Sequence, residues 1–263
     1  MALKQHKDAR VRYEQQVENS RAYVMPFIQK TKQLGPGTAI LEIGCGEGGV
    51  LQPLIQAGCQ CVGVDLDPPR IELAKEYLKD EIAAGKVEFL LQNIYDDAFF
   101  KRFNGHFDLI ILKDVIEHVP EQEKFIPYIK KLLRPGGQIF FGFPPWYMPF
   151  GGHQQIAETK LASKLPYYHI LPNPLYKAML KAFGETQGKI DELLEVKSTR
   201  ISIERFEKVV KQSGLKVMHK QHFLFNPIYK YKFGIEARNQ YKIISALPGI
   251  RNFLTTCVYY TVG

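Results

Sequence analysis

Between residues 38 and 143 the chain alternates short apolar runs with amphipathic stretches, and this alternation limits the fold more than any other feature. The amphipathic stretches near 48–57, 68–84, 96–102 and 121–133 have the length and apolar spacing of helices. The apolar runs have the length of buried strands: TAILEIG, CQCVGVD, VEFLLQN, FDLIILKD and GQIFFGF. Strands that alternate with helices predict a parallel sheet with helices on both faces.

The sequence on either side of this pattern predicts a helix before it and a more varied region after it. An apolar stripe over residues 8–33 predicts a helix that packs over the mouth of the core and stops at Gly35-Pro36-Gly37. After Phe143 the chain becomes rich in proline, glycine and aromatic residues, which is typical of a lid or substrate-binding insertion. Regular patterning returns with a helix near 202–213, then a strand over 215–225 and a last apolar strand over 253–262.

These elements predict four parts of one α/β chain. The sheet is expected to be doubly wound and Rossmann-like, with a mobile cap above it. The predicted parts are an N-terminal helical segment (1–37), a cofactor-binding core (38–143), a cap or substrate-binding insertion (144–200) and a C-terminal continuation of the core (201–263) with a basic insertion near 230–250.

Composition places the chain among ordinary globular proteins. Its 263 residues are 45% hydrophobic and 24% charged, and its formal net charge is +8. The four cysteines form neither a CxxC pair nor the density of a disulfide scaffold, which favours reduced thiols. The charged N-terminus lacks the apolar core of a signal peptide, and no run of 18 apolar residues occurs. We therefore expect a soluble, cytoplasmic protein, while its oligomeric state stays open.

The segment LEIGCGEGG follows the first predicted strand and predicts a ligand cradle. Gly44, Gly46 and Gly48 stand at alternate positions, so the turn can take positive φ and let a ligand approach the backbone. The helix after it would point its N–H groups at that ligand. This spacing differs from the GxGxxG of nicotinamide-dependent oxidoreductases. Asp65 ends the second strand, where its carboxylate can accept both hydroxyls of a ribose, although it could also cap the next helix.

The combination E-x-G-x-G-x-G, an acid after strand two, a polar residue after strand three and FDLIILKDVIEHV at strand four resembles the class I S-adenosylmethionine-dependent methyltransferases. The resemblance covers residues 38–143 and implies a seven-stranded sheet that ends in an antiparallel hairpin. It implies that S-adenosyl-L-methionine is the cofactor. Asn93 stands where the family commonly has Asp, and it would meet the adenine amine. The implied cofactor-binding residues are Glu42, Gly44, Cys45, Gly46, Asp65, Leu66, Asn93, Ile94 and Lys113.

The segment K-D-V-I-E-H-V after strand four holds the candidate catalytic and metal-binding residues. Asp114, Glu117 and His118 are three and four positions apart and would share one face of a helix. The segment resembles ubiquinone-pathway O-methyltransferases and small-RNA 2′-O-methyltransferases, in which these positions belong to a divalent metal site completed by a later histidine. His153 is the candidate for that histidine, either as a metal ligand or as a metal-free general base, and His118 is a second catalytic candidate. Alternatively, Glu117 and His118 only brace the helix.

The sequence leaves the methyl acceptor open. The leading hypothesis is methylation of a hydroxyl on a small hydrophobic or aromatic acceptor. The aromatic residues of the cap, from Phe143 to Tyr168, could line its pocket or only anchor the cap. An RNA 2′-O-methyltransferase is the second hypothesis, although no RNA-binding motif is present and a nucleic-acid partner is not expected. A catalytically inactive cofactor-binding regulator is the third. Lysine mixed with Leu, Tyr and Phe over 160–183 also predicts peripheral contact with a membrane surface.

Overall fold

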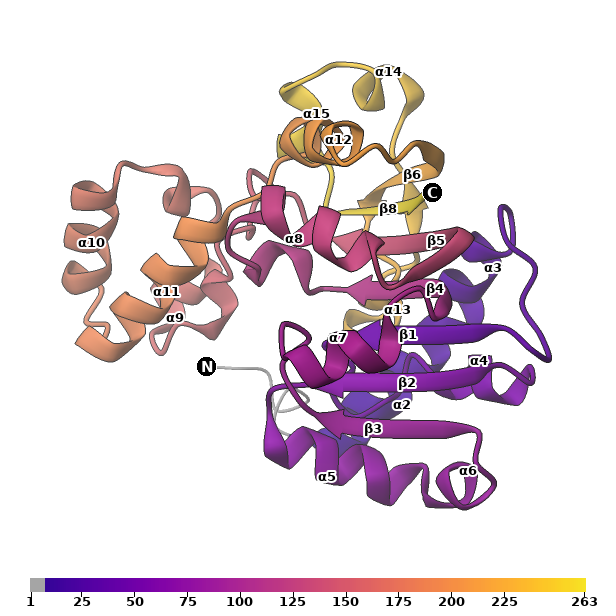
Figure 1. Cartoon of the computed structure of the whole chain (residues 1–263). Helices are drawn as coiled ribbons and strands as arrows, with labels where there is room; N and C mark the ends of the chain where they lie inside the picture. Colours follow the sequence, from indigo (N-terminus) through magenta and orange to yellow (C-terminus); the bar gives the residue numbers. More distant parts are fainter. Residues whose placement is uncertain (1–7) are drawn as a thin grey trace.

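The protein is an α/β structure built on one eight-stranded sheet, in a computed structural model that describes residues 8–263 (Figure 1). The strand order is β3-β2-β1-β4-β5-β8-β6-β7, and β8 runs antiparallel to both of its neighbours. The strands are β1 (Ala39–Ile43), β2 (Gln60–Asp65), β3 (Val87–Leu91), β4 (Phe107–Lys113), β5 (Leu133–Phe143), β6 (Val217–Phe225), β7 (Arg238–Asn239) and β8 (Cys257–Val262).

The predicted fold class is confirmed, with one correction to the strand count. The five strands of the core are parallel, and the two long C-terminal strands, β6 and β8, pair antiparallel. The eighth strand is β7, which pairs with the outer edge of β6. It has only two residues, too few to produce a recognisable pattern in the sequence. Thirty-one residues, 226–256, separate β6 from β8, so the two strands are neighbours in the sheet without being joined by a tight turn.

Helices cover both faces of the sheet, as the alternation predicts. In Figure 1, α7 and α8 lie in front of the strands and α2 and α4 lie behind them. The helices are α2 (Ala9–Asn19), α3 (Met25–Ile28), α4 (Gln52–Gln56), α5 (Pro68–Tyr77), α6 (Lys79–Ala83), α7 (Asp97–Phe103), α8 (Gln122–Lys130), α9 (Lys160–Lys164), α10 (Asn173–Ala182), α11 (Gln187–Thr199), α12 (Ile203–Gln212), α13 (Ile228–Phe233), α14 (Lys242–Ser245) and α15 (Ile250–Leu254).

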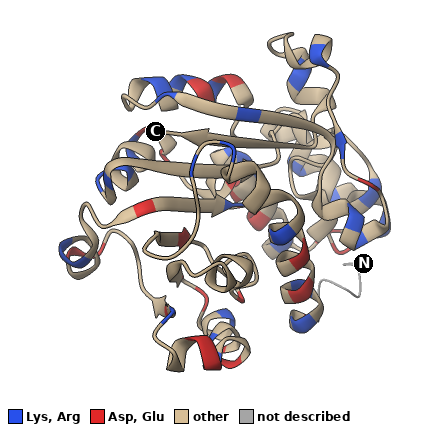
Figure 2. Cartoon of the chain, turned by 90° about the vertical axis from the view of Figure 1, so that its right-hand side faces the viewer, with Lys and Arg blue, Asp and Glu red and all other residues tan. Residues whose placement is uncertain are grey.

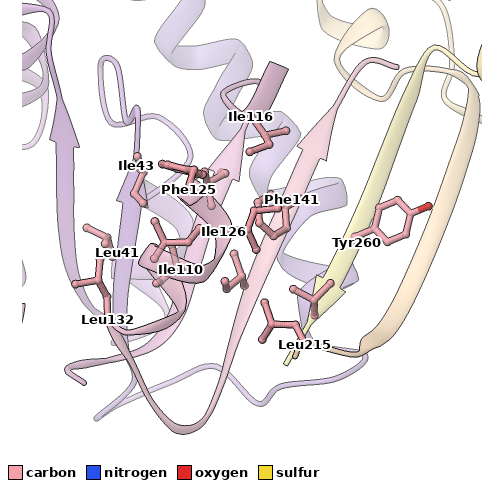
Figure 3. Close-up of a cluster of buried hydrophobic side chains, with 14 of the residues drawn as sticks. Leu41, Ile43, Ile110, Ile116, Phe125, Ile126, Leu132, Phe141, Leu215 and Tyr260 are labelled. Atoms are coloured by element: carbon pink, nitrogen blue, oxygen red, sulfur yellow. The ribbon is translucent and has the colours of Figure 1, made fainter. Parts of the chain in front are cut away.

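Alternate residues of the central strands enter two separate cores. Leu41 of β1 and Ile110 of β4 point to the face that α8 covers, where Phe125 and Ile126 pack on them (Figure 3). Their neighbour Ile40 points to the opposite face, toward α2 and α4. This period of two, with both sides apolar, is what a parallel sheet buried on both faces requires. The core strands are therefore rigid supports for the loops at their ends.

The predicted helix over 8–33 is shorter than expected and is interrupted. It continues as α-helix to Asn19, makes a π-helical turn over Ser20–Val24, and ends as α3 at Ile28. The cause lies in Pro26, which has no N–H and whose ring would clash with the carbonyl four residues before it. The wider π turn, closed by the Met25 N–H on the Ser20 carbonyl, accommodates the proline.

The last predicted strand also begins later than expected. Phe253 and Leu254 belong to α15, and β8 starts at Cys257. Asn252 holds α15 in place by accepting the Ile203 N–H at 2.8 Å. This contact comes from α12, almost fifty residues away, so a local apolar pattern cannot reveal it.

Helices α9, α10 and α11 form a small lobe beside the sheet (Figure 1). The lobe has its own apolar cluster, which includes Tyr168, Tyr176, Leu180 and Leu193. No described helix is long and apolar enough to cross a membrane. Peripheral contact of this region with a membrane surface stays a prediction.

Basic and acidic residues are interspersed on the helices (Figure 2). Several cations of the C-terminal part are paired with carboxylates. Arg205 pairs with Glu123 at 2.9 Å, and Lys220 pairs with Glu207 at 2.7 Å. The positive net charge is therefore partly compensated where the sequence is most basic.

Candidate functional site

The glycine turn connects the end of β1 with α4 and has the backbone conformation that its sequence predicts. Gly44, Gly46 and Gly48 all have positive φ, at 70°, 52° and 80°. The Gly44 N–H bonds to the Val64 carbonyl at 2.8 Å, which ties the turn to β2. Helix α4 begins only at Gln52, four residues later than predicted, because Gly48 is in the left-handed region and cannot start a helix. The cradle is therefore formed by the turn itself rather than by a helix end.

Asp65 closes this turn from the neighbouring strand. Its Oδ2 accepts the Gly46 N–H at 2.8 Å, and its Oδ1 accepts the Asp67 N–H at 3.0 Å. Asp67, not Asp65, caps α5 by accepting the Arg70 N–H. Each oxygen of Asp65 has a second lone pair, so the carboxylate can still accept two further hydrogen bonds.

Two cavities meet at the glycine turn. The larger, of about 560 Å³, is lined by four of the predicted cofactor residues: Asp65, Leu66, Asn93 and Ile94. Leu66 is 69% exposed and Ile94 is buried, while the Asn93 side chain accepts the Tyr95 N–H at 3.0 Å. This cavity is thus mainly apolar with a carboxylate and an amide at its rim, which suits a nucleoside.

The smaller cavity, of about 340 Å³, lies on the other side of Gly44. It is lined by the other predicted cofactor residues, Glu42, Cys45, Gly46 and Lys113, and by several residues that the sequence did not single out. The two cavities share Gly44, Arg70, Asp114 and His118. The structure therefore brings all nine predicted cofactor residues to one continuous hollow.

Several of the lining residues missed in the sequence come from the two ends of the chain. Arg12, Tyr13 and Gln16 of α2 line the smaller cavity, and Lys232 of α13 lines it from the C-terminal part. Helices α2 and α13 are in contact, since the Gln15 side chain donates to the Tyr231 carbonyl at 3.1 Å. The sequence predicts that the first helix covers the mouth of the core. It does not indicate which polar residues of that helix face the cavity.

Burial sets the charges inside the smaller cavity. Burial, with the nearby Asp65 carboxylate, raises the pKa of Glu42 well above its usual value, and Glu42 Oε2 has no hydrogen-bond partner among the described residues. Burial alone would lower the pKa of Lys113, but the adjoining Asp114 carboxylate outweighs it and raises that pKa. Lys113 and Asp114 form a hydrogen-bonded ion pair. Glu42 is therefore a buried acceptor that lacks a donor.

The D-V-I-E-H segment does not form the helical face that the spacing predicts. Asp114 has a φ of 56°, outside any helix, because its N–H bonds to the Gly142 carbonyl of the neighbouring strand at 2.7 Å. Only Ile116–His118 are helical, as a short 3-10 turn (η2). The prediction of one shared helical face for Asp114, Glu117 and His118 is therefore wrong.

The segment nevertheless meets the later histidine. One ligand atom each from Glu117, His118 and His153 lie within 4.8 Å of one another. The rings of His118 and His153 are 4.7 Å apart between centroids. Asp114 is not in this group, since its Oδ2 is engaged by Lys113. The four predicted metal-site residues thus divide into three that converge and one that pairs with a lysine.

The ionisation of the three converging residues follows from their burial. Burial, and then the Asp114 carboxylate, raises the pKa of Glu117 well above its usual value. Burial lowers the pKa of His118, and burial together with His118 lowers the pKa of His153 to about 4. Both imidazoles are therefore neutral at pH 7 and can accept a proton or ligate a cation.

The remaining histidines and cap aromatics have structural roles. His169 is fully buried, where its Nε2 donates to the Trp146 carbonyl at 2.8 Å and its Nδ1 accepts from Gln154 at 2.6 Å. His222 is buried against Tyr260. Among the described residues that line the two cavities, none is an aromatic residue of the cap. The cap aromatics that are buried, such as Trp146 and Tyr168, serve as anchors.

Comparisons with known proteins agree with this arrangement. Residues 41–141 match the family model of a methyltransferase domain. The chain is 30% identical over 105 residues to the ubiquinone biosynthesis O-methyltransferase of Aromatoleum aromaticum, which is 40% of this chain and 43% of that protein. It is 28% identical over 117 residues to the enzyme of the same name from Methylococcus capsulatus, which is 44% of this chain and 47% of that protein. The chain thus matches less than half the length of these relatives.

Solved structures show the same fold over more of the chain. The geranyl diphosphate C-methyltransferase of Streptomyces coelicolor A3(2) superimposes with a TM-score of 0.57 at 13% identity, over 92% of this chain and 76% of that one. The phosphoethanolamine N-methyltransferase 2 of Haemonchus contortus, solved with S-adenosyl-L-methionine, gives 0.58 at 15% identity, over 98% of this chain and 57% of that one. Residues 41–141 are therefore similar to a methyltransferase domain, and the chain has the fold of these solved methyltransferases.

Proposed function

We propose that the protein transfers a methyl group from S-adenosyl-L-methionine to a hydroxyl of a small hydrophobic or aromatic acceptor. The observation that carries this proposal is the continuous hollow around Gly44, which holds all nine residues that the motif implies for this cofactor. The names of the curated relatives support a hydroxyl as the acceptor group. No observation favours the RNA-methylating or the inactive alternative.

The protein's part in binding the cofactor follows from three residues. Asp65 accepts the ribose hydroxyls with the lone pairs that the Gly46 and Asp67 N–H groups leave open. Glu42 accepts from the α-amino group, which supplies the donor that its buried Oε2 lacks. Gly44 lets the ligand approach the turn, because a Cβ there would lie 2.6 Å from Cγ2 of Val115 and would intrude between the two cavities.

The bound cofactor supplies a sulfonium methyl group and its own leaving group, so the chain has to align the acceptor, exclude water and remove one proton. His118 lines both cavities. His153 lines neither of them, but its ring lies next to that of His118, at a tilt of 44°. Either neutral imidazole can accept the hydroxyl proton. The position of His118 in both cavities, with the His153 ring next to it, supports their assignment as the catalytic pair.

The same residues fit a divalent cation. Two neutral imidazoles and a carboxylate are a ligand set used for transition metals and zinc, and the buried Glu117 Oε2 has no hydrogen-bond partner among the described residues. Glu117, His118 and His153 would hold the ion, which would lower the pKa of an acceptor hydroxyl beside it. Asp114 is left out of this revised ligand set.

Thermal-shift measurements test cofactor binding. S-adenosylmethionine and S-adenosylhomocysteine are expected to raise the melting temperature, whereas nicotinamide dinucleotides are not. Stabilisation by a nicotinamide dinucleotide alone would overturn the proposal. A screen of host extracts with cofactor labelled in the methyl group then identifies the acceptor by its mass.

Replacement of His153 by Ala tests the catalytic pair. H153A is expected to bind S-adenosylhomocysteine normally and to lose at least about tenfold in turnover, as is usual when a general base or metal ligand is removed. The matched control is H106A. His106 is exposed and directly precedes β4, so it lies at the opposite end of that strand from Lys113 and the candidate site. Normal turnover by H153A removes both roles proposed for His153. If H153A does lose turnover, metal analysis of the parent protein and its activity in chelator decide whether His153 is a metal ligand or a metal-free general base.

A further inference from the structure

The smaller cavity contains one cation that the described part of the chain does not compensate. Four basic residues line this cavity. Arg12 pairs with Glu47, and Lys113 pairs with Asp114. Arg70 lies 3.7 Å from Asp67 and 3.9 Å from Glu47.

The remaining base is Lys232. Within residues 8–263 its ammonium has neither an ion-pair partner nor a hydrogen bond. By contrast, Lys230, two positions earlier on α13, pairs with Glu236 at 3.1 Å and does not line the cavity.

The surroundings of Lys232 make its lack of a partner costly. Burial lowers the pKa of Lys232, Asp114 opposes that shift, and Lys113 and Arg12 add to it. Lys232 lines the cavity together with Asp114 and His118, and its charge lowers the pKa of both Asp114 and His153. Lys232 is partly buried and lines the cavity, so an anion that enters this cavity would gain a charge-assisted contact with its ammonium.

The cofactor cannot fully balance this charge. S-adenosylmethionine carries one carboxylate, one ammonium and one sulfonium, so its binding adds a net positive charge to a cavity that already has one unpaired lysine. An anionic group on the other substrate would balance this charge.

We propose that the methyl acceptor carries an anionic group, a carboxylate or a phosphate monoester, and that Lys232 of α13 binds this group in the cavity beside His118. This inference rests on the proposed methyl transfer and narrows its substrate class. An acceptor anchored in this way presents its hydroxyl to His118 and His153. It is also attracted by the sulfonium before transfer and less so afterwards, when the cofactor has lost that charge, which favours release of the product.

The experiment measures binding of three small probes that need neither methyl transfer nor a metal. Benzoate, phenyl phosphate and the neutral benzamide are titrated calorimetrically into protein saturated with sinefungin, in the presence of chelator. Sinefungin has an ammonium where the cofactor has the sulfonium, so the charge of the cavity is kept without a reaction. At least one of the two anions is expected to bind about tenfold or more tightly than benzamide. The tighter anion identifies the carboxylate or the phosphate as the group that the site accepts.

Variants of α13 assign the effect to Lys232. K232M is expected to bind the preferred anion no better than benzamide, whereas K232R and the matched control K230M keep the preference. All variants are expected to bind sinefungin within about threefold of the parent protein, which also shows that they fold.

Three results would overturn the assignment. The parent protein could show no preference for either anion, or K232M could retain the preference. Alternatively, K232M could bind sinefungin more than about tenfold more weakly while keeping the anion preference, in which case Lys232 holds the carboxylate of the cofactor. If the parent protein does not bind sinefungin at all, the proposed function fails, and this outcome is distinct from the other three.

Discussion

Replacement of Asp65 by Asn changes one oxygen of the candidate ribose-binding carboxylate and almost nothing in its size. In the parent protein the two oxygens accept the Gly46 and Asp67 N–H groups at 2.8 and 3.0 Å. Asparagine keeps one accepting oxygen and presents an NH₂ group to the other donor. One backbone contact and one ribose contact are therefore lost.

The expected loss of affinity follows from that count. A hydrogen bond to a charged group contributes about 1.5–3 kcal/mol, and Asp65 is only partly buried, so about 2 kcal/mol is a reasonable value for the ribose contact. This corresponds to a roughly 30-fold increase in the dissociation constant. Calorimetric titration of D65N with S-adenosylhomocysteine measures this change directly.

The neighbouring Asp67 provides the control. Asp67 is exposed, caps α5 and lines neither cavity, and asparagine is about as good a cap as aspartate. D67N is therefore expected to bind the ligand within about threefold of the parent protein. The assignment of Asp65 is refuted if D65N also stays within threefold, or if the two variants lose affinity equally.

Two further predictions concern stability and are checked by chemical denaturation. G44A is expected to lower the free energy of unfolding by about 2–4 kcal/mol, because its Cβ would lie 2.6 Å from Cγ2 of Val115 at a φ of 70°. Gly37 has a similar φ of 85°, and a Cβ added there would meet no atom within 4 Å, so G37A should cost only the backbone strain of about 1–2 kcal/mol. Equal losses of unfolding free energy in G44A and G37A would refute the predicted clash. Burial would raise the pKa of Glu204, but hydrogen bonds from a backbone N–H and two side chains lower it to about 2. A depressed carboxyl pKa stabilises the fold above the unfolded-state value and loses this effect as the pH falls. E204Q should therefore cost about 1–2 kcal/mol at pH 7, after allowance for solvent exposure, and the difference should disappear between pH 4.5 and about 2. A pH-independent difference would contradict this prediction.

The sheet and the cofactor cradle could be predicted from the sequence because their signals are local. Leu41 and Ile40 alternate between two apolar cores, and that arrangement appears in the sequence as an unbroken apolar run. Gly44 and Gly46 need positive φ, and Asp65 ends its strand within hydrogen-bond reach of the turn. Each feature is fixed by residues that lie next to it in the chain or one strand away.

The parts that could not be predicted depend on contacts between distant segments. Asp114 leaves the expected helix because its N–H bonds to Gly142 of the next strand. Lys232 reaches the cavity because α13 packs on α2, more than two hundred residues earlier. Hydrophobic periodicity contains no information on such contacts, so a cavity lysine looks like any other lysine of a basic segment.

The candidate catalytic residues are held by the cap as well as by the sheet. Thr199, at the end of α11, donates its hydroxyl to the Glu117 carbonyl at 2.6 Å, and Gln122 of α8 donates to the Thr199 carbonyl at 2.6 Å. These two bonds attach the exit of the lobe to the short 3-10 turn that carries Glu117 and His118. His153 lies at the entrance of the same lobe, just after β5. The lobe therefore contacts the segment of Glu117 and His118 at one end and carries His153 at the other. A displacement of the lobe relative to the sheet would change the separation of His118 and His153, which the proposed proton transfer or metal binding requires to be short.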